Sequence, residues 1–287
     1  MKGLKEKVKL APFTTFKIGG PAKYFIIVKN ENQLIEALKW AKKNKIKYFI
    51  LGHGANILVS DQGFDGLVIK NEIKELKILS KTTITVGSGL TLGELLGFCL
   101  DHKLKGLEFL AGIPSTVGGA IVGNTGNPKK AIGDFISQVK VIDENLDIKI
   151  LSHQELKFAY RKSIFKEKDY IILSALFNLI KDTKENIQKK IKENIDNKKQ
   201  SQPLNRPSAG CAFKNPPGMS AGKIIEECGL KGKSMGAAKV SEIHANYIIN
   251  TNSAKAEEVV MLISYIKQQV RDKKNIQLQE EIQLVGF

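Results

Sequence analysis

Two glycine-rich stretches constrain the fold of this chain more than any other feature. The first is the turn Gly-His-Gly-Ala-Asn at residues 52–56, between two short apolar runs, and the second covers residues 111–126. Glycine is needed where the backbone adopts positive φ or where another group approaches it closely. Successive N–H groups in such a turn can form a concave anion site. Two stretches of this kind suggest a large phosphate-bearing ligand, although the first alone could be an ordinary glycine turn.

The composition indicates a globular protein. The chain has 287 residues, of which 42% are hydrophobic and 26% charged, and this balance is typical of a folded domain. No apolar run reaches the roughly 18 residues of a membrane span, and the charged N-terminus lacks the apolar core of a signal peptide. The three cysteines are too few for a disulfide scaffold, and the four histidines show no metal-ligand spacing. We therefore expect a cytoplasmic protein without membrane attachment or bound metal.

The net charge of +16 raises the alternative of a basic nucleic-acid-binding protein. However, Arg161, Arg206 and Arg271 are the only arginines, and the lysines are spread along the chain. No helix-turn-helix, zinc-finger or RNA-recognition pattern is present. We favour a solvated lysine surface that attracts anionic small molecules, and we expect no nucleic-acid partner.

The order of helical and strand patterns predicts an α+β fold in three consecutive parts. Residues 1–70 form a small α+β unit, residues 71–182 a second unit richer in strands, and residues 183–287 a third unit. Asn30 is a helix-capping residue, and Thr91 with Glu94 has the spacing of a capping box. Helices are expected at residues 31–44, 92–102, 182–199, 221–228 and 254–273.

Two residues are candidates for chemistry on their own properties. Arg161 is one of few arginines, and lysine cannot replace arginine where a carboxylate needs a planar, bidentate, permanently charged partner. A surface salt bridge is the alternative. Cys211 lies between Gly210 and Ala212 in a tight loop, and a thiol with a pKa of about 8.5 is a usable acid at neutral pH. A small buried thiol is the alternative there.

The last strand poses a question about two carboxylates. In a strand over residues 276–285, the side chains of Ile276, Leu278, Ile282 and Leu284 share one face. Glu280 falls on that apolar face, and Glu281 falls on the opposite one. Periodicity alone therefore predicts that Glu280 is the buried carboxylate.

Six segments, taken in order, resemble the UDP-N-acetylenolpyruvoylglucosamine reductase family over nearly the whole chain. They are Thr-Phe-Lys-Ile-Gly-Gly-Pro-Ala at 15–22, Gly-His-Gly-Ala-Asn-Ile-Leu-Val at 52–59, Gly-Ile-Pro-Ser-Thr-Val-Gly-Gly-Ala at 112–120, Tyr-Arg-Lys-Ser-Ile-Phe at 160–165, Ala-Gly-Cys-Ala-Phe-Lys-Asn-Pro at 209–216 and Leu-Gln-Glu-Glu-Ile at 278–282. The compact third unit resembles the shorter, type II form of the family. The resemblance implies a two-part FAD-binding domain of the vanillyl-alcohol-oxidase (PCMH) type in 1–70 and 71–182, and an α+β substrate domain in 183–287.

The resemblance also implies which residues contact the cofactor. The turn would face the FAD diphosphate, and the second stretch would pass beside the flavin. The residues so implied are Gly52, His53, Gly54, Ala55 and Asn56 in the turn, with Gly112, Ile113, Pro114, Ser115, Thr116, Gly118 and Gly119 in the second stretch.

The implied reaction is NADPH-dependent reduction of UDP-N-acetylglucosamine enolpyruvate to UDP-N-acetylmuramate, for peptidoglycan. NADPH would reduce FAD, and the enolpyruvyl group would then take hydride from flavin N5. Arg161 and Glu281 match the family pair that orients and polarises this group, so the motif selects Glu281 over Glu280. Cys211 matches the proton donor, where serine is commoner. Tyr160, Lys214 and Asn215 would contact the substrate, and we expect a monomer. An oxidase or dehydrogenase of the same flavin fold is the alternative, but it leaves the Cys211 and Glu281 segments unexplained.

Overall fold

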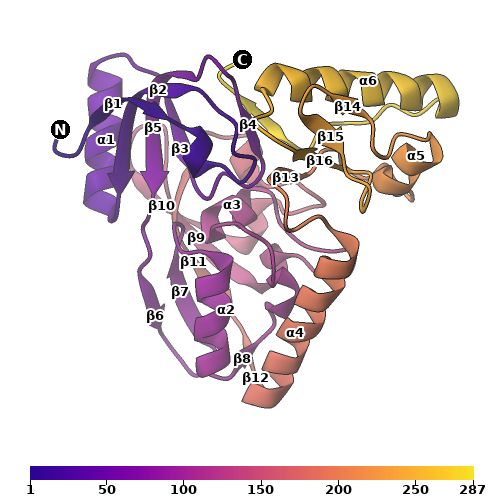
Figure 1. Cartoon of the computed structure of the whole chain (residues 1–287). Helices are drawn as coiled ribbons and strands as arrows, with labels where there is room; N and C mark the ends of the chain where they lie inside the picture. Colours follow the sequence, from indigo (N-terminus) through magenta and orange to yellow (C-terminus); the bar gives the residue numbers. More distant parts are fainter. The chain divides into compact units, whose positions relative to one another are not determined.

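The computed structural model describes residues 1–287 and contains two compact units, neither of which is continuous in sequence. Unit 1 comprises residues 1–4, 26–53 and 68–197, and unit 2 comprises residues 5–25, 54–67 and 198–287. Strands β2 (Pro21–Val28) and β5 (Phe64–Asn71) each contribute residues to both units (Figure 1). The expected division at residues 70 and 182 stays a prediction.

Unit 1 is built on a five-stranded antiparallel sheet in the order β10-β9-β11-β7-β6. Its strands are β6 (Leu76–Ile78), β7 (Thr83–Gly87), β9 (Ile136–Ile142), β10 (Ile148–Ser152) and β11 (Ile171–Asn178). Helices α2 (Leu92–Asp101) and α3 (Val117–Val122) share one hydrophobic core with this sheet. Burial of apolar side chains such as Val139 and Leu95 stabilises the unit by roughly 1.5–3 kcal/mol for each large side chain.

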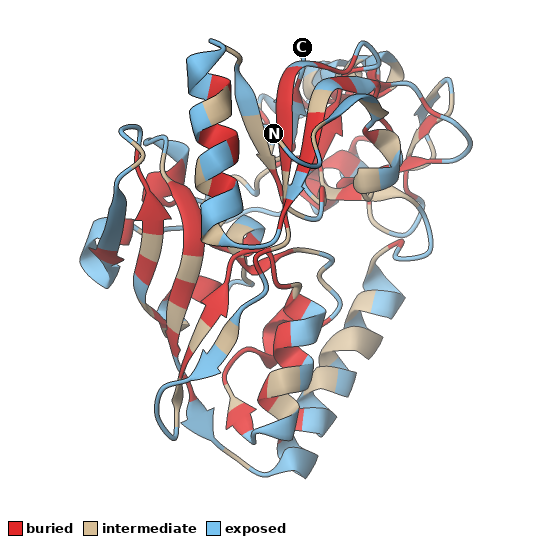
Figure 2. Ribbon diagram, turned by 90° about the vertical axis from the view of Figure 1, so that its left-hand side faces the viewer, coloured by how far each residue is buried: buried red, intermediate tan, exposed pale blue.

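Helix α1 (Glu31–Lys43) shows how the local sequence determines an element. The Asn30 side chain accepts a hydrogen bond from the Gln33 N–H at 2.9 Å, as its N-cap role predicts. Leu34, Leu38 and Ala41 are buried along one stripe, and Figure 2 shows such buried stripes on helices whose other sides are exposed. A further sheet has the order β1-β2-β5-β3, with β1 (Lys5–Lys9) and β3 (Tyr48–Leu51) at its edges.

Unit 2 contains a four-stranded sheet in the order β13-β16-β15-β14. Its strands are β13 (Ser208–Cys211), β14 (Ser234–Met235), β15 (Ala238–Val240) and β16 (Tyr247–Asn250). Helices α5 (Ala221–Glu227) and α6 (Ala256–Lys274) share a second core with this sheet. In the same unit, β4 (Ile57–Val59) pairs in parallel with β17 (Gln283–Val285).

The remaining regular elements are short connections and one long helix. These are β8 (Leu104–Lys105), β12 (Ile180–Lys181), α4 (Lys184–Ser201) and five 3₁₀ turns: η1 (Ala11–Phe13), η2 (Glu108–Leu110), η3 (Ile132–Phe135), η4 (His153–Leu156) and η5 (Ile164–Lys166). The α+β class is confirmed, and each expected helix is present within a few residues of its predicted bounds. No helix has both the length and the apolarity that crossing a bilayer requires.

The prediction for the final strand is wrong, and with it the prediction that Glu280 is buried. Regular strand begins only at Gln283. The Glu280 side chain is 38% exposed and ion-paired with Lys267 at 2.6 Å, and Leu284 is 47% exposed. The physical reason is that residues 279–281 bond to a loop rather than to a regular ladder. The two-residue alternation therefore does not continue through this segment.

Candidate active site

The glycine turn at residues 52–56 has a backbone that needs glycine at its centre. Gly54 has φ 67°, and a Cβ at this position would collide with the Phe13 carbonyl. Thr15 supports the same turn, because its N–H donates to the Gly54 carbonyl at 3.1 Å. The Thr15 hydroxyl donates to the Ser208 carbonyl at 2.7 Å, at the start of the strand that ends in Cys211. Thr15 therefore links Gly54 to that strand within unit 2.

The amide groups of this turn are available to a ligand. None of the chain's backbone hydrogen bonds uses the N–H of Gly54, Ala55 or Asn56 as donor. Three successive N–H groups around a left-handed residue are the arrangement of an anion-binding nest. Desolvating such groups without an acceptor is unfavourable, so an anion or water must satisfy them.

Gly52, at the start of the turn, is in contact with the second glycine-rich stretch. A Cβ on Gly52 would lie 2.5 Å from Thr116 Oγ1. The Gly52 carbonyl accepts a hydrogen bond from Lys70 Nζ at 2.6 Å. Burial lowers the pKa of Lys70 from its ordinary value. Unit 1 thus holds a half-buried lysine that the sequence analysis missed; its only sequence signal is a lysine ending the apolar run Leu67–Ile69 in β5.

The second stretch uses its backbone differently. The N–H groups of Val117 and Gly118 donate to the carbonyls of Leu90 and Ser88, both at 2.8 Å. The N–H of Gly119 donates to Thr116 Oγ1 at 3.3 Å, which caps α3. These groups are satisfied internally, so any cofactor contact from this part of the stretch must come from other atoms.

Small residues in this stretch permit close packing. A Cβ on Gly118 would lie 2.9 Å from Ser88 Cβ, and Gly112 has φ 79°. Gly112 also lines an apolar groove of about 220 Å³ with Gly97 of α2 and Ile191 of α4. Three other predicted cofactor residues, Ile113, Pro114 and Ser115, form a tight turn. The Ser115 N–H donates a hydrogen bond to the Ile113 carbonyl at 2.9 Å, across Pro114.

Arg161 and Tyr160 lie in a loop of unit 1. Arg161 has φ 54°, a left-handed conformation that is unfavourable by roughly 1–2 kcal/mol for a residue with a side chain. Its Nη1 donates to the Gly126 carbonyl at 3.4 Å, and its guanidinium lies 5.5 Å from the centre of the Tyr160 ring. Nine other non-glycine residues, among them Lys45 and Lys103, also have positive φ, so this conformation does not by itself distinguish Arg161.

Unit 2 brings Cys211 and Glu281 onto adjoining segments. The Glu281 N–H donates to the Ala212 carbonyl at 2.8 Å, and the Lys214 N–H donates to the Gln279 carbonyl at 2.8 Å. Cys211, Lys214 and Glu281 are each partly buried. The Asn215 side chain has a structural partner, because its Oδ1 accepts from the Ala221 N–H at 2.9 Å at the start of α5.

Asn246 is a second residue that the sequence analysis did not select. It is 2% exposed, and its side chain bonds both the N–H and the carbonyl of Phe213, at 2.9 and 2.8 Å. Its own carbonyl accepts from the Ala212 N–H at 2.7 Å. Asn246 therefore fixes the loop that follows Cys211 from the side of β16. Nothing in the local sequence indicates this clamp.

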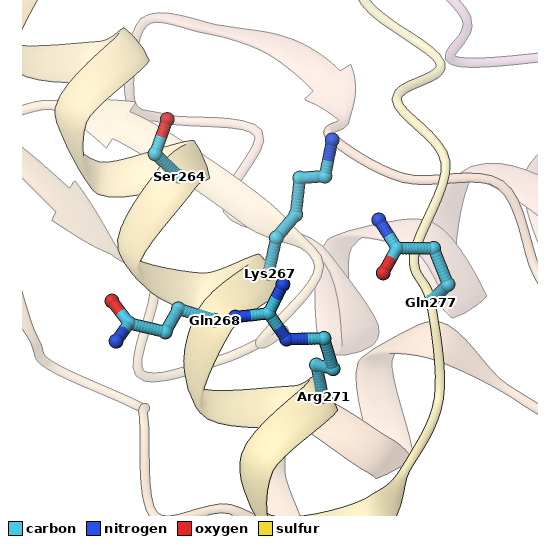
Figure 3. Close-up of a pocket in the computed structure, with 5 residues that line it drawn as sticks. All are labelled: Ser264, Lys267, Gln268, Arg271 and Gln277. Carbon is cyan, nitrogen blue, oxygen red and sulfur yellow. The ribbon is translucent and has the colours of Figure 1, made fainter.

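A polar hollow in unit 2 is separate from these residues. Its volume is about 330 Å³, and it is lined by Ser264, Lys267, Gln268, Arg271 and Gln277 (Figure 3). None of the predicted site residues lines it. Its Lys267 donates to the neighbouring Glu280. Partial burial opposes ionisation of Glu280, but this hydrogen bond, a backbone hydrogen bond and the nearby lysine charges together outweigh it and lower the pKa of the carboxyl.

Comparisons with known proteins match both parts of the chain. Residues 22–151 match the family model described as an FAD binding domain, and residues 202–285 match that of the UDP-N-acetylenolpyruvoylglucosamine reductase C-terminal domain. Among curated relatives, the UDP-N-acetylenolpyruvoylglucosamine reductase of Caldanaerobacter subterraneus subsp. tengcongensis is 45% identical, over 95% of this chain and 90% of its own length. That of Chlamydia felis is 41% identical, over 98% and 94%.

One solved structure extends this similarity to three dimensions. The crystal structure of UDP-N-acetylenolpyruvylglucosamine reductase from Thermus caldophilus is similar with a TM-score of 0.85 and 34% identity. The match covers 98% of this chain and 99% of that one.

Proposed function

Because the chain belongs to the UDP-N-acetylenolpyruvoylglucosamine reductase family and carries an FAD-binding domain, we propose that it reduces UDP-N-acetylglucosamine enolpyruvate with NADPH. The product would be UDP-N-acetylmuramate, a peptidoglycan precursor made in the cytoplasm. The observation that carries this proposal is the hydrogen bond between Glu281 N–H and the Ala212 carbonyl. It places the two expected catalytic residues of unit 2 on adjoining segments, which a different flavin enzyme would have no reason to keep.

The residues of the glycine turn fit the diphosphate of FAD. The N–H groups of Gly54, Ala55 and Asn56 donate to no acceptor in the chain, and charge-assisted hydrogen bonds from such groups are among the stronger ones. The second stretch, from Gly112 to Gly119, would contact the flavin ring through side chains and carbonyls rather than through the N–H groups already used. When bound, FAD supplies the hydride-transfer chemistry.

The three expected catalytic residues would each have a different role. Arg161 would bind and orient the substrate carboxylate, since a guanidinium offers two parallel donors to it. Glu281 would polarise the enolpyruvyl group. The Cys211 thiol would give its proton to the carbon next to the one that takes hydride. Thiols are stronger acids than hydroxyls, so cysteine can serve where serine is commoner.

Three further residues are proposed to contact the substrate. Lys214 would neutralise part of the diphosphate charge, and Asn215 would hydrogen-bond the sugar. Tyr160 is 58% exposed, so its ring is accessible to a ligand. We expect the enzyme to act as a monomer.

The proposal is tested by following flavin absorbance anaerobically. The purified protein should be yellow, should bleach with NADPH, and should regain colour when UDP-N-acetylglucosamine enolpyruvate is added. Bleaching without recovery would favour an oxidase or dehydrogenase with another substrate. A colourless protein that FAD cannot reconstitute would refute the flavin assignment and revive the nucleic-acid alternative suggested by the charge of +16.

Variants at position 211 test the proton donor. Cys211→Ala should leave bleaching by NADPH unchanged and slow the recovery of colour by about 10²–10⁴-fold, the usual contribution of a general acid. Cys211→Ser should retain most of the recovery rate. Cys228→Ala is the matched control, since that thiol is buried in the core of unit 2. Equal recovery rates in Cys211→Ala and the wild type would exclude Cys211 as the donor.

A further inference from the structure

Asn56 has a side chain that reaches a different partner from the one the family resemblance implies. Its Nδ2 donates to the main-chain carbonyl of Glu281 at 2.9 Å. Its own main-chain carbonyl accepts from the Gln283 N–H at 3.0 Å. Asn56 therefore contacts the segment 281–283 with both its side chain and its backbone, at the point where the parallel β4–β17 pairing begins.

The segment that carries Glu281 is anchored by the buried side chains of Leu278 and Ile282 and by main-chain hydrogen bonds. Regular strand begins only at Gln283, and α6 ends at Lys274. Between them, the Gln279 carbonyl accepts from Lys214, and the Glu281 N–H donates to Ala212. The backbone of Glu281 is thus held on two sides: its N–H is bound next to Cys211, and its carbonyl is bound by Asn56.

We propose that Asn56 is a positioning residue for Glu281. By holding the Glu281 carbonyl, it fixes the peptide from which the expected catalytic carboxylate projects, relative to the Cys211 loop. Asn56 is also the last residue of the glycine turn, so one residue joins the expected diphosphate site to the expected acid–base pair. This inference rests on the proposed function, because it assigns Glu281 a catalytic role.

The two half-reactions separate this role from simple cofactor binding. In the proposed reaction, reduction of FAD by NADPH needs the cofactor in place, whereas Glu281 acts only on the enolpyruvyl sugar. Reoxidation by the enolpyruvyl sugar needs both. A residue that positions Glu281 therefore affects reoxidation selectively, whereas a residue that serves the diphosphate alone affects FAD affinity and both half-reactions. The carboxamide has two N–H groups, so the bond to Glu281 does not by itself decide between these roles.

The experiment compares Asn56→Ala with the wild type in stopped-flow measurements of the FAD-saturated enzyme. We expect reduction by NADPH within about twofold of wild type and reoxidation slowed by about 10–100-fold, the range for a lost orienting contact. Asn56→Asp keeps the side-chain shape but cannot donate, and it should slow reoxidation at least as much. Asn194→Ala is the matched control, since it removes an exposed bond of the same type, from Nδ2 to the Lys190 carbonyl. A similar slowing of both half-reactions would overturn the proposal.

A second readout does not depend on turnover. Hydrogen exchange of the peptide containing residues 279–285 should be faster in Asn56→Ala, because the Glu281 and Gln283 amides lose their fixed geometry. Unchanged exchange there would also overturn the proposal. Failure of the proposed function itself would look different: the wild type would not be reoxidised by the enolpyruvyl sugar, whatever the exchange rates of the variant.

Discussion

The two glycine-rich stretches are similar in composition and differ in what their backbones do. In the turn at 52–56, the N–H groups of Gly54, Ala55 and Asn56 have no acceptor in the chain. In the second stretch, those of Val117, Gly118 and Gly119 are all bonded internally. The first arrangement can bind an anion directly. The second packs a short helix tightly against the segment that begins at Ser88.

Glycine density therefore does not by itself identify a phosphate site. Glycine permits both a left-handed turn and the close approach of two backbones, and a sequence shows the residue without showing which use it serves. The two uses differ in whether the backbone N–H groups have acceptors within the chain. Single substitutions in one stretch, or in a residue that supports it, can test this distinction.

The largest effect is expected from Gly54→Ala. A Cβ there would collide with the Phe13 carbonyl in a left-handed conformation, so the turn must change shape and its N–H groups must turn away. We expect FAD affinity to fall by about 100-fold, equivalent to two lost hydrogen bonds to a charged group. Fluorescence titration with FAD measures this affinity. Gly218→Ala is the control, since Gly218 has φ 71° with no atom near its Cβ. An equal loss of FAD affinity in Gly218→Ala would show that backbone strain alone, and not the N–H groups of the turn, causes the loss.

Gly118→Ala should lower the free energy of unfolding and have little effect on FAD affinity. Its Cβ would lie 2.9 Å from Ser88 Cβ, and overpacking of this kind usually destabilises by about 1–3 kcal/mol. Urea unfolding should show that loss, while the folded variant binds FAD within about threefold of wild type. Gly97→Ala is the control, because Gly97 lies in α2 with open space around it and should gain roughly 0.5–1 kcal/mol. If Gly118→Ala instead lost FAD affinity without losing stability, the distinction between the two stretches would fail.

Lys70→Met tests the support beneath the turn. The Lys70 ammonium donates to the Gly52 carbonyl, at the first residue of the turn. We expect FAD affinity about tenfold weaker, matching roughly 1.4 kcal/mol for a charge-assisted bond. Burial lowers the pKa of Lys70 below 10.5. The ammonium charge should therefore be lost as pH rises through that lowered pKa, and with it the higher FAD affinity of the wild type relative to Lys70→Met. Lys39→Met, an exposed change in α1, is the control, and equal affinities for both variants would contradict the role of Lys70.

The smallest effect concerns the capping box beside the second stretch. Glu94 closes this box with Thr91, which is bridged to Thr116. Although desolvation opposes it, hydrogen bonds from Lys74 and Thr91 lower the Glu94 pKa to about 2. Glu94→Gln should therefore be less stable by about 1 kcal/mol at pH 7.

The sign of the pH dependence follows from that lowered pKa. The contribution of Glu94 is complete above its unfolded pKa of about 4.3 and is lost as pH falls through about 2. The stability difference between wild type and Glu94→Gln, measured by urea unfolding, should accordingly shrink across this window. A difference that stayed constant from pH 7 to pH 3 would show that the carboxylate charge is not involved.

Local signals predicted local structure well. The Asn30 cap, the Thr91–Glu94 box and the apolar stripe of α1 depend on residues within four positions of one another, and all are present. The prediction failed at residues 276–282, where hydrogen bonds from a loop far away in sequence replace the ladder that the alternation assumes. Periodicity reports the burial of a regular strand, and it does not apply where the strand is interrupted.

The α+β class, the family and the identity of the expected site residues follow from the sequence, because ordered motifs and short-range patterns are properties of the chain. Tertiary structure alone decided that Lys70 supports Gly52, that Asn246 clamps the loop after Cys211, and that Asn56 holds Glu281. The last of these contacts joins residues 225 positions apart. No local propensity encodes such a pairing, since it exists only after the fold has brought both backbones together.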